Sequence, residues 1–133
     1  MKRLKLPFLT LGLIAFLFSG CGLGDAADKA ESQSKQFHAH MKRHDITAMM
    51  GMVHEDAKAN NLQEWENLFK TIEDFGAVRK VKKNMGFQSN VNNGVHTVTL
   101  NYTLEFDSKK LQEEIIWQDS KDGSMKIISL YFN

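Results

Sequence analysis

The side chains best placed for proton transfer are a carboxylate and an imidazole in the second half of the sequence. Glu113 alternates with Leu111 and Ile115, so on a strand these three side chains would share one apolar face. His96 begins another alternating segment and would lie on its apolar face too. A carboxylate and an imidazole on one such surface could act as acid and base. The alternative is that Glu113 and Glu114 lie on an edge strand, where charged side chains commonly reach water.

Three histidines close together in the first half raise the question of a metal site. At about 100° per residue on a helix, His40 and His44 lie on one side, whereas His38 points away from His40. Zinc takes three or four ligands, so a site would need a further side chain such as Asp45 or His54. A solvent-exposed helix flank is the simpler explanation for two histidines four residues apart. The sequence therefore predicts no metal site.

Methionine is the other abundant ligand type, with seven residues in the chain. Thioether sulfur is a soft ligand that suits Cu(I), and several methionines gather at positions 41–52. Met49 and Met50, however, share a helical stripe with Ile46 and Val53, where methionine is an adaptable core residue. We therefore expect core packing and no cofactor. The chain also lacks a Ser-His-Asp pattern and a glycine-rich phosphate loop, which favours a non-catalytic protein.

The only cysteine, Cys21, lies three positions after the end of an apolar run at positions 6–18. This run is shorter than the roughly 20 residues that a membrane-spanning helix needs. Basic residues precede the run, and the small residues Ser19 and Gly20 follow it, which is the layout of a secretory signal peptide. Because the chain has no second cysteine, an internal disulfide is excluded.

The sequence Phe18-Ser19-Gly20-Cys21 resembles the lipobox of bacterial lipoproteins. The family usually has Leu where this chain has Phe18. The resemblance implies that a diacylglycerol is attached to the sulfur of Cys21, that cleavage removes residues 1–20, and that the new amino group is acylated. Each buried methylene contributes about 0.8 kcal/mol, so two or three acyl chains anchor a protein durably.

The lipoprotein resemblance also implies a location. Residues 21–27 are rich in glycine and alanine and are predicted to form a lipidated tether that keeps the domain near the membrane. Gly22 and Leu23 follow the cysteine, without the aspartate that retains lipoproteins of this family in the inner membrane. In a cell with two membranes, the implied location is the periplasmic face of the outer membrane.

The charge of the chain excludes nucleic acid as an expected partner. Of the 17 lysines and arginines, three lie before Ser19, which leaves 14 basic against 16 acidic side chains after cleavage, a net charge of minus two. Nucleic-acid binding requires a clustered basic face. The densest basic run, at positions 79–83, alternates with Val78 and Val81 and is predicted to be the solvated face of a strand, with lipid headgroup binding as the alternative.

The remaining residues predict a single α+β domain over residues 28–133. Apolar periodicities of three and four predict helices, and Asp45 is a suitable cap for the second of them. Alternating patterns with Asn-Asn-Gly and Asp-Gly turns predict strands in a meander. We expect N-terminal helices packed on a curled four-stranded antiparallel sheet, with helices near 28–42, 45–53 and 62–75 and strands near 78–89, 95–106, 109–118 and 125–132.

The last strand is apolar on both faces, with Ile127 and Tyr131 on one and Ile128, Leu130 and Phe132 on the other. A strand of this kind is normally covered on both faces. The predicted helices cover one face of the sheet. An envelope protein partner or a homodimer formed through the sheet could cover the other.

Three segments carry a resemblance to a known fold. They read HMKRHDITAMMGMVHEDAK, LQEWENLFKTIEDFGAVRKVK and MKIISLYFN, and they are similar to the nuclear-transport-factor-like or cystatin-like cone fold. The resemblance implies helices on a curled sheet, but this fold hosts enzymes, binding pockets and adaptors, so no activity follows from it. We expect a lipid-anchored bacterial envelope lipoprotein that is a non-catalytic binding or adaptor module. The alternative is a small-molecule-binding cone domain with acid/base catalysis at Glu113 and His96.

Overall fold

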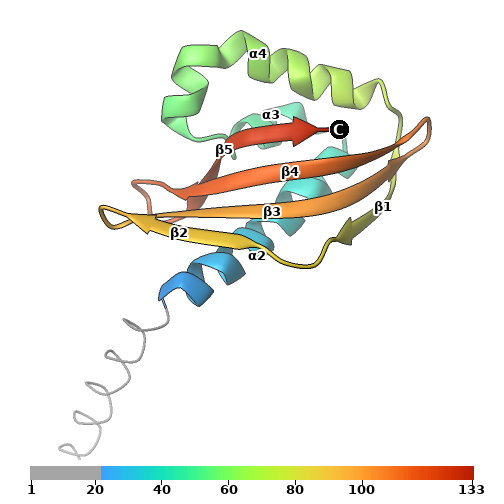
Figure 1. Ribbon diagram of the computed structural model, residues 1–133. Helices are drawn as coiled ribbons and strands as arrows, with labels where there is room; N and C mark the ends of the chain where they lie inside the picture. Colours follow the sequence, from blue (N-terminus) through green and yellow to red (C-terminus); the bar gives the residue numbers. More distant parts are fainter. Residues whose placement is uncertain (1–21) are drawn as a thin grey trace, which may run out of the picture.

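The computed structural model describes residues 22–133. The predicted signal peptide and the predicted lipidation site at Cys21 lie outside the described residues. Helices come first and strands follow (Figure 1), in the order α2 (Gly22–Lys42), α3 (Ile46–Met50), α4 (Glu55–Glu73), β1 (Val78–Lys83), β2 (Gln88–Asn92), β3 (Val95–Phe106), β4 (Lys110–Asp119) and β5 (Met125–Phe132). The α+β class predicted from the sequence is confirmed. Among the described helices, none is both long enough and apolar enough to cross a membrane.

The sheet is antiparallel and open, and β3 is its longest strand. The strand order is β1-β3-β4-β5, and β2 also pairs with β3. Because β1 pairs with the C-terminal half of β3 and β2 with its N-terminal half, these two strands follow one another along the same edge. The single strand predicted over 78–89 is therefore two strands, and the sheet has five strands instead of four. The interruption includes Gly86, whose φ of 86° is incompatible with a continuous strand.

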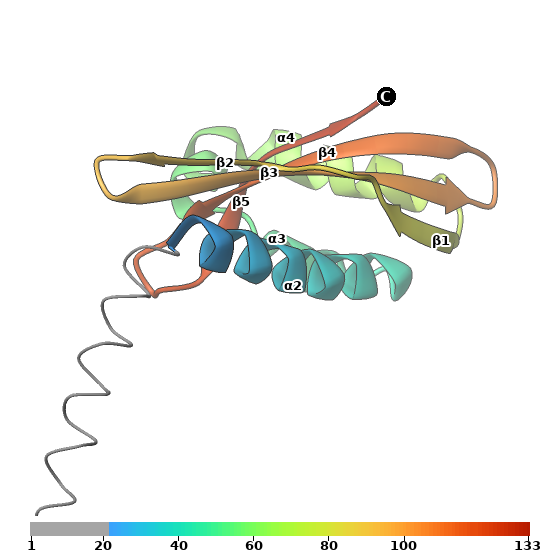
Figure 2. The ribbon, with the colours of Figure 1, turned by 60° about the horizontal axis from the view of Figure 1, so that its bottom comes forward.

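Helices α2 and α3 cover one face of the sheet (Figure 2). The strands direct alternate residues toward these helices, as the alternation in the sequence predicts. The side chains that β3 buries are Val98, Leu100, Tyr102, Leu104 and Phe106. On the helical side, Phe37 of α2 lies 5.9 Å from Phe69 of α4, measured between ring centroids, so the core joins both long helices to the sheet.

Helix α2 begins at Gly22, whereas the sequence predicts a helix from residue 28 and a tether over 21–27. In the structure residues 22–27 are helical, and Ala26 and Ala27 are buried in the core. Alanine has the highest helix propensity and adds no bulk between helix and sheet. The composition that predicted a flexible tether therefore also suits a helix that packs into the core at Ala26 and Ala27.

The connections after α2 agree with the predicted caps. The Asp45 carboxylate accepts a hydrogen bond of 3.1 Å from the amide of Ala48 at the start of α3. Helix α4 begins at residue 55, earlier than predicted, and Asn61 has non-helical backbone angles where the helix was expected to start. Of the apolar residues at helical spacing in this segment, Trp65, Phe69 and Ile72 are buried, whereas Leu62 is 50% exposed.

Candidate functional site

A buried histidine and a buried glutamate form a direct contact between α2 and β4. His38 Nε2 lies 2.7 Å from Glu113 Oε1, and the exposed fractions of the two side chains are 5% and 0%. His38 lies one turn after Ser34, which is also buried, so it belongs to the helix face that packs on the sheet. Glu113 lies on the same face of β4 as Ile115, as the alternation predicts. We call this contact the His38–Glu113 pair.

The structure does not bring Glu113 and His96 together, so the predicted acid/base pair is wrong. His96 Nδ1 lies 2.8 Å from Asp119 Oδ2, and the His96 backbone amide donates to the same oxygen at 2.8 Å. In the β3–β4 register Glu113 is opposite Tyr102, whereas His96 lies near the far end of β4. Asp119 lies six positions after Glu113 along the strand, which corresponds to about 20 Å.

The alternative prediction, that Glu113 and Glu114 both reach water from an edge strand, is wrong as well. Glu114 is exposed, as expected of a charged side chain, but Glu113 is not. Strand β4 lies between β3 and β5 and is not an edge strand. Successive side chains point to opposite faces, so Glu113 must enter the core.

Two polar atoms beside the pair are fully buried, Tyr102 Oη and Glu113 Oε2, and neither makes a hydrogen bond of good geometry among the described residues. The rings of His38 and Tyr102 meet edge to face with centroids 4.7 Å apart. Burial raises the pKa of the Tyr102 phenol, a weak hydrogen bond with the neighbouring Ser34 hydroxyl opposes the rise, and the Glu113 carboxylate adds to it. The Ser34 oxygen also accepts a hydrogen bond of 2.8 Å from Trp117 Nε1.

A pocket of about 340 Å³ opens between α2 and β1, and we call it the lysine pocket. His38 and Tyr102 form part of its wall. The other residues that line it are Glu31, Lys35, Ala39, Lys42, Val81 and Lys83. The polar and apolar groups together make this the strongest candidate binding site in the described chain.

One ion pair crosses the lysine pocket. Lys83 Nζ of β1 lies 2.6 Å from Glu31 Oε2 of α2. The hydrogen bond from Lys83 lowers the pKa of Glu31, against a smaller opposing effect of burial, and the charges of Lys83 and Lys35 act in the same direction as the hydrogen bond. Lys35 and Lys42 have no carboxylate within ion-pair distance among residues 22–133.

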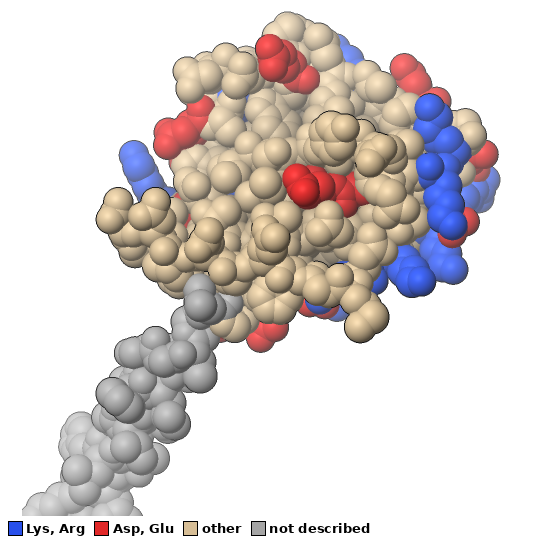
Figure 3. All heavy atoms as spheres, in the orientation of Figure 1, with Lys and Arg blue, Asp and Glu red and all other residues tan. Residues whose placement is uncertain are grey.

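The basic run at 79–83 is divided between the two faces of the sheet. Val81 and Lys83 pair with Leu104 and Tyr102, which face the helices, and both line the lysine pocket. Lys82 points the other way and is exposed, as predicted for a solvated face. Figure 3 shows lysine and arginine side chains gathered at the end of the sheet where β1 lies.

The remaining candidate ligands lie apart from one another. His40 Nδ1 is 2.7 Å from an Arg43 guanidinium nitrogen, and His44 Nδ1 is 4.0 Å from Glu73 Oε2. Within the described part of the chain, no three His, Cys, Asp or Glu side chains are grouped so that they could hold a metal ion. Met49, predicted as a core residue, is buried.

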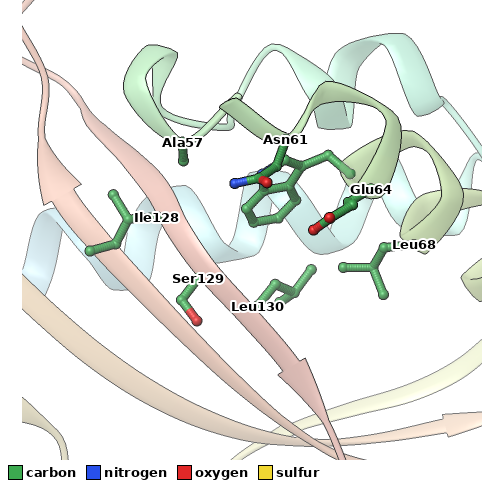
Figure 4. Close-up of a pocket in the computed structure, with 8 residues that line it drawn as sticks. Ala57, Asn61, Glu64, Leu68, Ile128, Ser129 and Leu130 are labelled. Carbon is green, nitrogen blue, oxygen red and sulfur yellow. The ribbon is translucent and has the colours of Figure 1, made fainter. Parts of the chain in front are cut away.

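A second pocket, of about 300 Å³, lies between α4 and β5 (Figure 4). Asn61 and Glu64 extend from α4 on one side, and Ser129 and Leu130 lie on the other. On β5 itself Tyr131 is 60% exposed. A protein partner or a second copy on this part of the sheet stays a prediction.

The sequence pattern does contain a signal for His38. Ala30, Ser34, Phe37 and Met41 recur at helical spacings, and His38 lies four residues after Ser34. A histidine on the apolar face of a helix needs a polar partner in the core. Only the packing of α2 on β4 reveals that this partner is Glu113.

Comparisons with known proteins supply no family for this chain. No protein-family model matches it, and no curated protein or solved structure shows significant similarity to it.

Proposed function

We propose that the domain is a binding module for a small molecule, and that the lysine pocket is its binding site. The observation that carries this proposal is an open, largely apolar pocket in which Lys35 and Lys42 have no carboxylate partner in the described chain. Concave sites with an apolar wall and a few polar groups are typical of small-molecule binding. The His38–Glu113 pair fixes the imidazole that forms part of the wall beside the ring of Tyr102.

The lysine pocket can be tested by blocking it. Ala39 lines the pocket and is partly exposed, so Ala39→Trp should fill the space without disturbing the core. Ala59 is an exposed residue of α4, and Ala59→Trp is the matched control. A fragment library should shift the backbone amide resonances of pocket residues in the wild type and in Ala59→Trp, but not in Ala39→Trp. Fragment shifts that persist in Ala39→Trp would contradict the proposed site.

The second part of the proposal concerns location: the protein is a lipoprotein anchored in the bacterial envelope through Cys21. The order of basic, apolar and small residues before Cys21 supports it. Because α2 begins at Gly22, anchoring at Cys21 would place the domain against the membrane surface without a flexible tether. In a cell with two membranes, we place it on the periplasmic face of the outer membrane.

The anchor can be tested independently of the pocket. Cys21→Ala should abolish incorporation of a labelled fatty acid and prevent removal of residues 1–20. Ser19→Ala keeps a small residue at its position and is the matched control, which should still be labelled. The proposal fails if the Cys21→Ala protein still incorporates the fatty acid.

A further inference from the structure

We propose that the ligand of the lysine pocket is a small organic monoanion with an apolar body. This inference rests on the proposed binding function of the same pocket. It adds the chemical class of the ligand, which follows from the charges and the apolar wall of the site.

The charges of the pocket leave a positive excess. Glu31 is the only acidic residue among those that line it, and Lys83 is its partner at 2.6 Å. Lys35 and Lys42 are two helical turns apart on α2, so they point to the same side of the helix. Both lack a carboxylate partner in the described chain, and an anion bound between them would neutralise part of this excess.

The wall of the pocket is largely apolar. Val81, Ala39 and the ring of Tyr102 line it, and the methylene stems of the lysines add apolar surface while their ammonium groups reach water. A volume of about 340 Å³ is at the lower end of the range for small-molecule sites. The pocket therefore suits one compact ligand and is too small for the two acyl chains of a membrane lipid.

The polar groups of the wall are held in place by their own contacts. The Tyr102 hydroxyl is fully buried beside the Ser34 hydroxyl, so the ring of this residue lines the pocket and its oxygen does not. Glu113 binds Nε2 of His38 and fixes the imidazole beside Tyr102. The ammonium groups of Lys35 and Lys42 are therefore the donors left for an anion.

The test is a titration of the full-length protein in non-ionic detergent, followed through the amide resonances of Ala39 and Val81. The probes are hexanoate, hexanamide, which has the same apolar chain without the charge, and inorganic phosphate, which has charge without the chain. Hexanoate should bind about tenfold more tightly than either of the others, a difference of about 1.4 kcal/mol. Dihexanoylphosphatidylglycerol is a fourth probe, which represents a lipid headgroup with acyl chains.

Lysine variants test which ammonium groups bind the anion. Replacing Lys35 and Lys42 together with alanine should weaken hexanoate binding about threefold to tenfold, as expected for two partly exposed ion pairs. Lys82→Ala is the matched control, because Lys82 is on the opposite face of β1 from Lys83.

Each probe has an outcome that overturns the inference. Equal binding of hexanamide would remove the role of the charge, although the pocket would remain a binding site. Equal binding of phosphate would remove the role of the apolar body. Tighter binding of dihexanoylphosphatidylglycerol would make membrane lipid the source of the anion and exclude a small free ligand. If none of the four probes shifts the pocket resonances, the ligand class is wrong, whereas the binding function itself depends on the fragment screen with Ala39→Trp.

Discussion

His38 and Glu113 are 75 residues apart in the sequence, and their side chains meet at 2.7 Å in the core. The contact joins the first helix of the described chain to the middle of the sheet. Among the described residues, neither side chain has another hydrogen-bond partner. Removing either side chain would therefore leave the other buried without a hydrogen-bond partner.

The first prediction is that the two residues are energetically coupled. His38→Leu leaves Glu113 buried without a partner and should lower the free energy of unfolding by about 3 kcal/mol or more. The double variant His38→Leu, Glu113→Leu should lose less than the sum of the two single variants, because no unpaired group remains. Urea denaturation of the four proteins measures this difference, and additive losses would contradict the coupling.

The second prediction concerns the hydrogen bond between Ser34 and Trp117. Ser34→Ala leaves the buried indole N–H without an acceptor, which should cost about 1 to 3 kcal/mol of stability. Ser108→Ala is the control, since its hydroxyl bond to the Phe75 carbonyl is exposed and water can replace it. Thermal or urea denaturation should rank the two variants in this order. Equal losses of stability in Ser34→Ala and Ser108→Ala would mean that the Trp117 indole N–H donates to another acceptor when the Ser34 hydroxyl is removed.

The third prediction follows from the backbone at Gly76. Its φ is 90°, and a Cβ atom added there would lie 2.7 Å from Asp107 Cβ. Asp107 cannot easily move, because its carboxylate accepts hydrogen bonds from the Ala77 amide and from Arg79. Gly94 has a φ of 79° but open space around it. Gly94→Ala should therefore cost about 1 to 3 kcal/mol from backbone strain alone, and Gly76→Ala should cost more. Equal losses of stability in the two variants would show that the Asp107 side chain moves away from the added Cβ atom at little energetic cost.

The fourth prediction is a pH dependence caused by Tyr102. Burial raises its pKa above the ordinary value of 10.0. Between that value and the folded pKa, the unfolded chain releases the phenol proton while the folded chain keeps it, so stability falls as the pH rises above about 10. Tyr102→Phe removes this contribution and should flatten the decline between about pH 9 and 11. Tyr131→Phe changes an exposed tyrosine and is the control, and an unchanged slope in Tyr102→Phe would contradict the prediction.

The elements with clear periodicity could be predicted from the sequence, and the irregular ones could not. The alternation from Val98 to Phe106 and the stripe from Trp65 to Ile72 are strong because each buries a continuous face. The division into β1 and β2 at Gly86 was missed, because one glycine with a positive φ can mark either a bulge inside a strand or its end.

The candidate site, too, could be predicted from the sequence only in part. Glu113 could be identified as a carboxylate on an apolar face, but its partner could not, since face and register do not say which helix residue lies above it. His96 satisfied the pattern as well as His38, and the register places it against Asp119. Lys82 and Lys83 are adjacent in the basic run, yet only Lys83 lines the lysine pocket.

The sequence by itself determined the α+β class, the Asp45 cap and the inward faces of β3 and β4, because these depend on local periodicity and on the polarity of each side chain. The faces predicted for β5 are wrong, because a register shift against β4 places Leu130 and Phe132 on the same face as Ile127. It also carries the lipobox-like order that ends at Cys21, which remains a prediction. Only the tertiary structure decided that α2 packs against the sheet from its first turns and that His38 meets Glu113. Contacts between distant segments depend on helix placement and strand register, and small shifts of either exchange the partners.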